Sequence, residues 1–222
     1  VVGTNGAFGY YDFMLNITVN LSGTGDISLI DTGEEVIYDG IVHGIHSVAY
    51  DKINDGAYVV GERGLFGYYN ITSNFTTNLG ETDIGDWISG QVIYAVEYDT
   101  IHGGAFIVAQ SGVYGYYDKP NNITIDLRDI DVGDFIANAI LTAAAFDEKN
   151  DGFFIVGRHQ GTGLAVFAYY NHSNNSVIDL SNTDQNNFLD NPTGGLEDVA
   201  YDNINDGAYL VGTGGKFAYY SR

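Results

Sequence analysis

The stretch AYDKINDGAYVVGERGLFGYYN, Ala49–Asn70, decides the fold because the chain repeats it. It returns as EYDTIHGGAFIVAQSGVYGYYD at Glu97–Asp118 and as AYDNINDGAYLVGTGGKFAYY at Ala200–Tyr220. A copy with an insertion spans Ala145–Asn171, and the chain opens inside a further copy, VVGTNGAFGYYD, at Val1–Asp12. A unit that recurs at this length indicates a solenoid, a propeller or an array.

Each repeat is expected to form four short strands. In the first strand, apolar residues alternate before an Asp, as at Val48 and Tyr50, which is the period of a half-buried strand. A turn ending in Asp-Gly or Gly-Gly follows, and it predicts a hairpin because glycine accepts a positive φ. The later strands are expected at 57–61, 105–109, 153–157 and 208–212 (second), at 65–69, 113–117, 165–170 and 216–220 (third), and at 17–21, 75–79, 123–127 and 176–180 (fourth).

These units predict an all-β fold, a β-propeller of four-stranded antiparallel blades. About 4.5 repeats of roughly 48–55 residues fill a single domain, 1–222, with approximate repeat boundaries at 1–44, 45–92, 93–140, 141–195 and 196–222. The chain enters at a second strand and leaves after a third, so two solutions stay open. Five blades would leave both terminal blades incomplete, whereas in a four-blade solution residues 17–21 close the sheet begun by 196–220.

Aromatic residues recur at fixed places in the repeat. A double tyrosine closes each third strand, and we expect it to pack between neighbouring blades with one ring buried and the other at the rim. Trp87 follows Asp86 as Phe135 follows Asp134, which indicates a repeated packing position. The double tyrosines are 10/11, 68/69, 116/117, 169/170 and 219/220.

The composition excludes several classes of function. With 29 acidic and 8 basic residues the net charge is −21, which disfavours nucleic acid and anionic lipid as partners. There is no cysteine, hence no disulfide or thiol chemistry, and no apolar run has the length of a membrane helix, so no membrane insertion is expected. The chain begins Val-Val inside a repeat, which indicates a processed chain or a piece of a longer one.

Asn-x-Ser/Thr sequences fall at one place in the repeat, between the third strand and the end of the fourth. The fourth strand is the outer edge of a blade, where a bulky glycan fits. Turns and strand edges also favour Asn and Thr, which is the alternative explanation. The pattern predicts covalent N-glycans and an exported protein, with glycosylation at Asn16, Asn20, Asn70, Asn74, Asn122, Asn171 and Asn174.

Acidic turns and histidines are the candidates for metal binding and catalysis. A repeated Asp pair, such as Asp51 and Asp55, offers oxygen ligands for calcium, but the turns lack the alternating ligands of an EF-hand loop. No nucleophile elbow is present, and proximity among so many acids does not define a glycosidase pair. We therefore expect no catalytic residue, no metal site and no cofactor, with calcium at the Asp turns as the alternative to ordinary hairpin turns. The other Asp pairs are 147/151 and 202/206, and the histidines, at unrepeated positions without metal-ligand spacing, are 43, 46, 102, 159 and 172.

The repeat core, an apolar-Val-Gly-x-x-Gly-apolar-x-x-Tyr pattern after a Tyr-Asp turn, resembles propeller repeats of the photosystem-assembly-factor and Asp-box kind. Similar repeats occur in archaeal cell-surface and extracellular filament proteins. The resemblance covers nearly the whole chain and implies blades only. Sialidase activity is not implied, because the sequence Ser-x-Asp-x-Gly-x-Thr-Trp is absent.

These observations predict a non-enzymatic, extracellular structural protein. We expect a glycosylated subunit of a surface layer or filament, whose partners are copies of itself joined by strand or blade complementation. The alternative is a lectin-like or adhesive propeller that binds ligands through exposed repeated aromatics. The residues expected to mediate assembly lie in the terminal strands: Val1, Val2, Phe8, Tyr10, Tyr11, Leu210, Val211, Phe217, Tyr219 and Tyr220.

Overall fold

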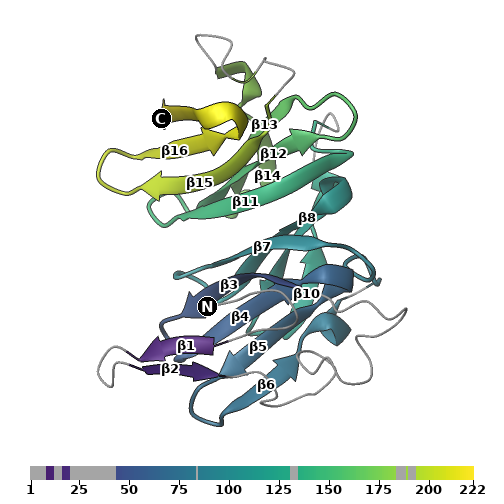
Figure 1. Cartoon of the computed structure of the whole chain (residues 1–222), viewed down its shortest axis with the longest axis vertical. Coiled ribbons are helices and arrows are strands. Elements are labelled where there is room, and N and C mark those ends of the chain that lie inside the picture. The colour runs from purple at the N-terminus through teal and green to yellow at the C-terminus, as the bar shows by residue number, and fades with distance from the viewer. Residues whose placement is uncertain are drawn as a thin grey trace.

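The computed structural model describes residues 9–12, 17–20, 44–83, 85–130, 135–183, 189 and 194–222. These residues form separate antiparallel sheets joined by turns and short 3-10 segments, so the prediction of an all-β fold built from blades is confirmed (Figure 1). None of the helices in this part of the chain is long and apolar enough to cross a membrane.

Three consecutive repeats each form a four-stranded antiparallel blade, with the strands paired in chain order. The first blade is β3 (Ile45–Asp51), β4 (Gly56–Gly61), β5 (Phe66–Asn70) and β6 (Phe75–Asn78). The second is β7 (Ile93–Tyr98), β8 (Ala105–Ala109), β9 (Tyr114–Asp118) and β10 (Ile123–Asp126). The third is β11 (Ala139–Asp147), β12 (Gly152–His159), β13 (Ala165–Asn171) and β14 (Ser176–Asp179).

The two ends of the chain form smaller sheets. The fourth blade has three strands, β15 (Leu196–Asp202), β16 (Gly207–Gly212) and β17 (Lys216–Ser221). An N-terminal hairpin consists of β1 (Gly9–Asp12) and β2 (Ile17–Asn20), which correspond to the third and fourth strands of a repeat. Because β2 pairs with β1 and not with β17, the described strands do not form the closed four-blade arrangement. They agree with the alternative in which the first and last blades are incomplete.

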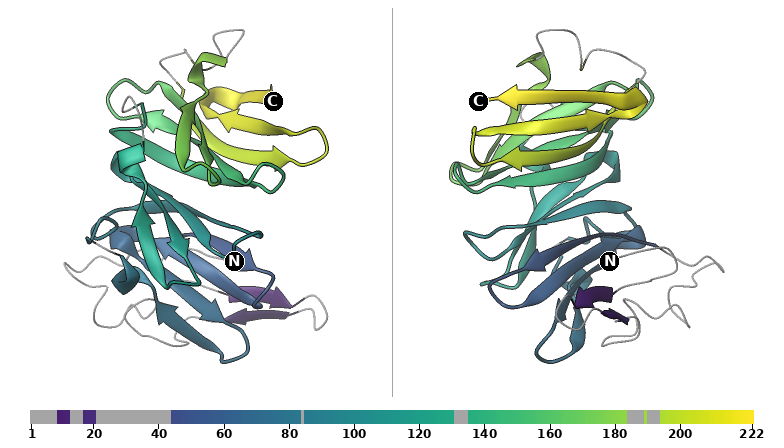
Figure 2. Two further views of the ribbon diagram at one scale, coloured as in Figure 1. Left: turned by 180° about the vertical axis from the view of Figure 1, so that it is seen from behind. Right: turned by 60° about the vertical axis from the view of Figure 1, so that its left-hand side comes forward.

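The blades succeed one another along an open arc. The first strands β3, β7, β11 and β15 of consecutive blades lie side by side, and the N-terminal hairpin and the fourth blade lie at opposite ends (Figures 1 and 2). Hydrophobic clusters fill the junctions between first and second, second and third, and third and fourth blades. The core is therefore divided among the junctions, and each blade depends on its neighbours.

Residues of each second strand alternate between two junctions. Tyr58 packs toward the following blade, whereas Val59 faces the other side, where it packs with Ile45 and Tyr69. Phe106 and Phe154 repeat the position of Tyr58, and all three are at most 1% exposed. The period of two read from the sequence thus maps directly onto the two faces of a blade.

The double tyrosines differ from the expectation of one buried and one rim-exposed ring. In the second and third blades both rings are at most 5% exposed, because the pair occupies both faces of the third strand. Tyr116 and Tyr117 illustrate this, and each hydroxyl group reaches a turn: Tyr116 donates to Asp99 (3.0 Å) and Tyr117 to Asn122 (2.9 Å).

The turn between first and second strands also differs from the expectation. The positive φ belongs to the residue before the glycine, as at Asp55 (51°), Asp151 (53°) and Asp206 (57°). The glycine itself is required for space, because a Cβ atom on Gly56 would lie 2.2 Å from the hydroxyl oxygen of Tyr68. The same collision would occur at Gly104, Gly152 and Gly207.

Candidate functional site

In the first, second and third blades, the turn after the first strand is built around a buried carboxylate. Asp51, Asp99 and Asp147 are 0% exposed, and their Oδ1 atoms accept hydrogen bonds from the backbone N–H groups two and three residues later. A tyrosine of the same blade donates its hydroxyl group to the Oδ2 atom of each. The Tyr-Asp pairing is therefore part of every complete blade.

At two junctions the next blade supplies a cation to this carboxylate. Lys119 of the second blade donates to Asp51 of the first (2.7 Å) and lies over the Tyr68 ring. Arg222 at the C-terminal end donates to Asp147 of the third blade (2.5 Å). Burial raises the pKa of Asp51, but the hydrogen bonds from Lys119 and Asn54 outweigh it and hold this pKa well below its ordinary value.

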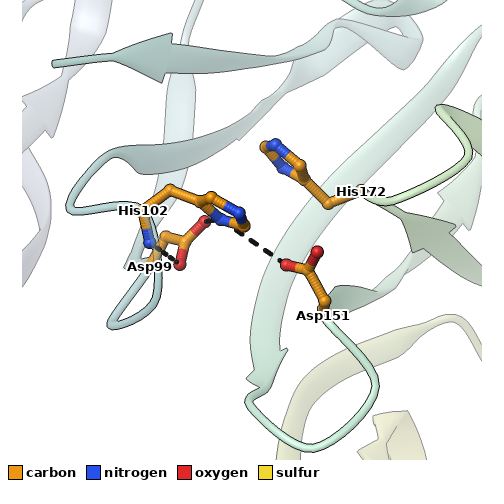
Figure 3. A group of neighbouring side chains, drawn as sticks. All are labelled: Asp99, His102, Asp151 and His172. Atoms are coloured by element: carbon orange, nitrogen blue, oxygen red, sulfur yellow. Dashed lines mark hydrogen bonds and ion pairs between the residues drawn. The ribbon is translucent and has the colours of Figure 1, made fainter. Parts of the chain in front are cut away.

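The middle junction has histidines at the corresponding places. His172 stands two residues after a double tyrosine, as Lys119 and Arg222 do, and His102 stands three residues after Asp99, where the other repeats have Asn. The two imidazole rings come from neighbouring blades and stack, with centroids 4.3 Å apart and planes 11° apart (Figure 3). His102 Nδ1 lies 2.9 Å from Asp99 Oδ2 and 3.5 Å from Asp151 Oδ1.

These four side chains form a compact group of potential metal ligands. One ligand atom each from Asp99, His102, Asp151 and His172 lies within 4.8 Å of the others. His172 Nδ1 and Asp151 Oδ1 are buried and have no hydrogen-bond partner. Burial, followed by the neighbouring His102, lowers the pKa of His172 and favours the neutral imidazole that a metal requires.

The sequence did not reveal this group because its members come from three separate segments. The repeated Asp pairs within one turn do not meet in such a group; the one found in the described part of the chain draws its carboxylates from two different turns. Asp206 is already paired with Lys149 (3.0 Å) and Asn150 (2.9 Å) of the preceding blade. The signal that could have indicated the group was the replacement of Asn by His102 in a single repeat.

A second feature is a cavity of about 440 Å³ between the first strands of the second, third and fourth blades. Its lining includes Glu97, Glu148, Tyr201 and Asn203. Glu97 occupies a position that is Ala in the other complete repeats, and burial raises its pKa to about 7. Glu97 is thus an ionisable group on the cavity wall at a position where the other blades have Ala.

A third feature is the outer face of the fourth blade, called here the open face. Its side chains are Tyr209, Val211, Phe217 and Tyr219, which are 42%, 38%, 67% and 40% exposed. In the second and third blades the same four repeat positions are at most 5% exposed, because the next blade covers them. The open face is thus a junction face without a neighbouring blade among the described residues.

The structure places the predicted assembly residues on different faces. Val211, Phe217 and Tyr219 lie on the open face, whereas Leu210 is 3% exposed in the junction with the third blade, and Tyr220 contacts Phe154 and Phe167 there. Tyr10 and Tyr11 belong to β1, and the remaining predicted residues, Val1, Val2 and Phe8, lie outside the described residues.

The predicted glycosylation sites lie at the turns and edges of the outer strands. Asn74 and Asn122 are exposed with φ of 53°, and each accepts a tyrosine hydroxyl group at 2.9 Å. Asn174 is exposed, and Asn70 and Asn171 are half-buried. Asn20 is in β2, and Asn16 lies outside the described residues. The turn geometry gives several of these residues a structural role, and glycosylation stays a prediction.

No protein-family model matches the sequence, and the search among curated proteins returned no match. Solved structures similar to the chain include a nidogen/laminin complex (TM-score 0.60, 10% identity, 95% of this chain and 68% of that one). Another is the Myceliophteria thermophila Cps50 (Swd1) β-propeller domain (TM-score 0.59, 11% identity, 93% and 60%). A third is the extracellular domain of the hybrid two-component system BT4673 from B. thetaiotaomicron (TM-score 0.59, 12% identity, 80% and only 21%). These likenesses show the propeller fold.

Proposed function

We propose that the protein is a structural module that assembles through the open face with a second copy of itself. The observation that carries this proposal is that Tyr209, Val211, Phe217 and Tyr219 are exposed at repeat positions that neighbouring blades otherwise cover. Burying apolar surface of this kind is the main driving force of association. At each internal junction one face of a blade packs against the opposite face of the next blade, so a blade of another copy has the appropriate shape and chemistry.

The unpaired outer edge of β17 among the described strands supports the choice of a second copy. The fourth blade ends with β17, whose outer edge pairs with no strand of the described chain, and β2 carries the fourth-strand pattern of the repeat. Asp12 pairs with Ile17 in the N-terminal hairpin, as Asn70 pairs with Phe75 in the first blade. The same register would pair Ser221 with Ile17 of a second copy.

The buried tyrosine pairs favour this function over a lectin-like module. Stacking a sugar requires exposed aromatic faces, but the repeated rings of the second and third blades are packed within the fold. The setting we propose is extracellular, at a cell surface, with N-glycans on the exposed outer turns and with layers or filaments as the assembled form. The seven Asn-x-Ser/Thr sequences support it, and intact mass of the native protein compared with the sequence mass tests the glycans.

Sedimentation of the whole chain tests self-assembly. We expect a mass that rises with concentration up to about 100 μM, the range of a weak interface, and a monomer for the double variant Tyr209→Asp/Phe217→Asp. Ile53→Asp is the matched control, because Ile53 is 61% exposed on a turn of the first blade. A wild-type protein that stays monomeric throughout this range, with its thermal unfolding intact, contradicts the proposal.

Introduced cysteine pairs test which strand pairs with the outer edge of β17. The sequence has no cysteine of its own that could interfere. A mixture of Ser221→Cys and Ile17→Cys chains should form a disulfide heterodimer, whereas Ser221→Cys mixed with Thr162→Cys should not. The double variant Ile17→Cys/Ser221→Cys at low concentration distinguishes closure of one chain on itself. An internal disulfide there, without heterodimers in the mixture, would rule out the second copy and favour a closed four-blade ring.

A further inference from the structure

The group of Asp99, His102, Asp151 and His172 lies at the junction of the second and third blades (Figure 3). We propose that it binds one divalent transition-metal ion, with zinc as the best fit, and that the ion joins these two blades. Asp99 and His102 come from the turn of the second blade, and Asp151 and His172 from the third. The site is independent of the open face and does not rest on the assembly proposed above.

The donor set selects the class of ion. Two imidazole nitrogens and two carboxylate oxygens suit zinc and neighbouring transition metals, whereas calcium and magnesium prefer oxygen ligands alone. In a tetrahedral site with bonds of about 2.0–2.1 Å, ligand atoms lie about 3.3 Å apart. The separation of 3.5 Å between His102 Nδ1 and Asp151 Oδ1 is close to this value. All four ligand atoms lie within 4.8 Å of one another, so small side-chain rotations would complete the set.

Two of the ligand atoms make no hydrogen bond within the described residues, and Asp151 Oδ1 has only the longer contact of 3.5 Å with His102 Nδ1. His172 Nδ1 and Asp151 Oδ1 are buried without a hydrogen-bond partner, which is costly unless another group satisfies them. The remaining contacts orient the donors: Tyr116 donates to Asp99 Oδ2 (3.0 Å), Ser173 donates to the other oxygen of Asp151 (2.8 Å), and Tyr116 and Tyr170 pack edge-on against His172. Such supporting contacts are typical of metal sites.

Comparison with the other junctions gives the electrostatic argument. There, Lys119 and Arg222 offset the buried carboxylates Asp51 and Asp147. At the middle junction, Asp99 and Asp151 lie 2.9 Å and 3.5 Å from His102 Nδ1, and His172 stands where the other two junctions have Lys119 and Arg222. A divalent cation would supply at this junction the positive charge that a lysine or an arginine supplies at the other two.

Zinc titration of the whole chain tests the site. After treatment with a chelator, we expect one zinc ion per chain by elemental analysis and calorimetry, and a thermal midpoint that rises with zinc concentration. His102→Asn, which restores the residue of the other repeats, should weaken zinc binding by about tenfold or more and abolish the rise. His172→Lys, which restores the residue of the first junction, should do the same while keeping the apo protein folded.

His159→Asn is the matched control, because His159 lies at the end of β12 outside the group, and it should bind zinc like the wild type. Cobalt in place of zinc should give the visible absorption of a four-coordinate site in the wild type and not in His102→Asn. Absence of stoichiometric zinc in the wild type overturns the proposal, as does undiminished binding by both His102→Asn and His172→Lys. In either case the histidines act as polar contacts between blades only.

Discussion

A single glutamate, Glu97, breaks the pattern of the repeat. The other three blades carry Ala49, Ala145 and Ala200 at its position, in the first strand of each blade. Burial raises the pKa of Glu97 to about 7, with a smaller contribution from Asp198 and partial compensation by a hydrogen bond from the Phe146 backbone. At neutral pH this side chain therefore carries a proton in a substantial fraction of molecules.

Replacing Glu97 by Gln should change how stability depends on pH. The folded-state pKa lies above the ordinary value of 4.5, so the folded protein holds a proton that the unfolded chain releases between about pH 4.5 and 7. Glu97 therefore favours folding most below pH 4.5 and loses this contribution as the pH rises through 7. Chemical unfolding at pH 8 should show Glu97→Gln more stable than the wild type by about 1–3 kcal/mol, with no difference near pH 4.

Glu148 supplies the control for this experiment. It lines the same cavity but is exposed, so Glu148→Gln removes a carboxylate from the cavity wall while Glu97 stays in place. A wild-type and Glu97→Gln pair whose stability difference is the same at pH 4 and pH 8 would contradict burial as the cause of the shift.

At the scale of elements, the turn between third and fourth strands depends on asparagine. Asn74, Asn122 and Asn175 have φ of 53°, 53° and 50°, and each accepts a hydroxyl hydrogen bond from the second tyrosine of its pair. Asparagine tolerates the left-handed region better than other non-glycine residues. One side chain thus sets the turn and satisfies the buried tyrosine.

Two substitutions of Asn122 separate these contributions. Asn122→Gly keeps the backbone conformation but loses the hydrogen bond from Tyr117, and should cost about 1–2 kcal/mol of unfolding free energy. Asn122→Ala also incurs left-handed strain and should cost about 1 kcal/mol more. Denaturant unfolding measures both; equal losses for Gly and Ala would mean that φ does not govern this turn. Asn121→Ala is the control, because it removes only an exposed hydrogen bond to Asp118 and leaves the Tyr117 hydrogen bond to Asn122 in place.

At the scale of the whole molecule, the charge of −21 opposes compaction. The ion pairs at the junctions involve few cations, and Asp51 and Asp147 are buried beneath theirs, so salt screens the surface repulsion more than these pairs. We expect the thermal midpoint to rise between about 0.05 and 0.5 M NaCl. Choline chloride should give the same rise, and a fall in both salts would show that the exposed ion pairs outweigh the repulsion.

Much of the fold could be predicted from the sequence because its information is local and repeated. The alternation before each Asp and the double tyrosines placed nearly every strand of the described blades within two residues. The physical reason for a repeated residue was harder to predict than its position. Gly56 is needed because the Tyr68 hydroxyl group approaches it closely, and the sequence of the turn does not reveal this contact between strands. In the second and third blades both rings of the tyrosine pair are buried because a neighbouring blade covers each face of the sheet.

The candidate sites could not be predicted from the sequence, because their residues come from different blades. Asp99 belongs to the second blade and His172 to the third, and their side chains come together only because these two blades pack against each other. Leu210 and Val211 are adjacent in sequence and were both expected to mediate assembly, but they lie on opposite faces of β16. The sequence by itself determined the strands, the turns and the repeat, since these follow from local periodicity and backbone preference. The tertiary structure decided which equivalent positions meet a neighbour, because burial and ligand geometry arise from packing between segments distant in the chain.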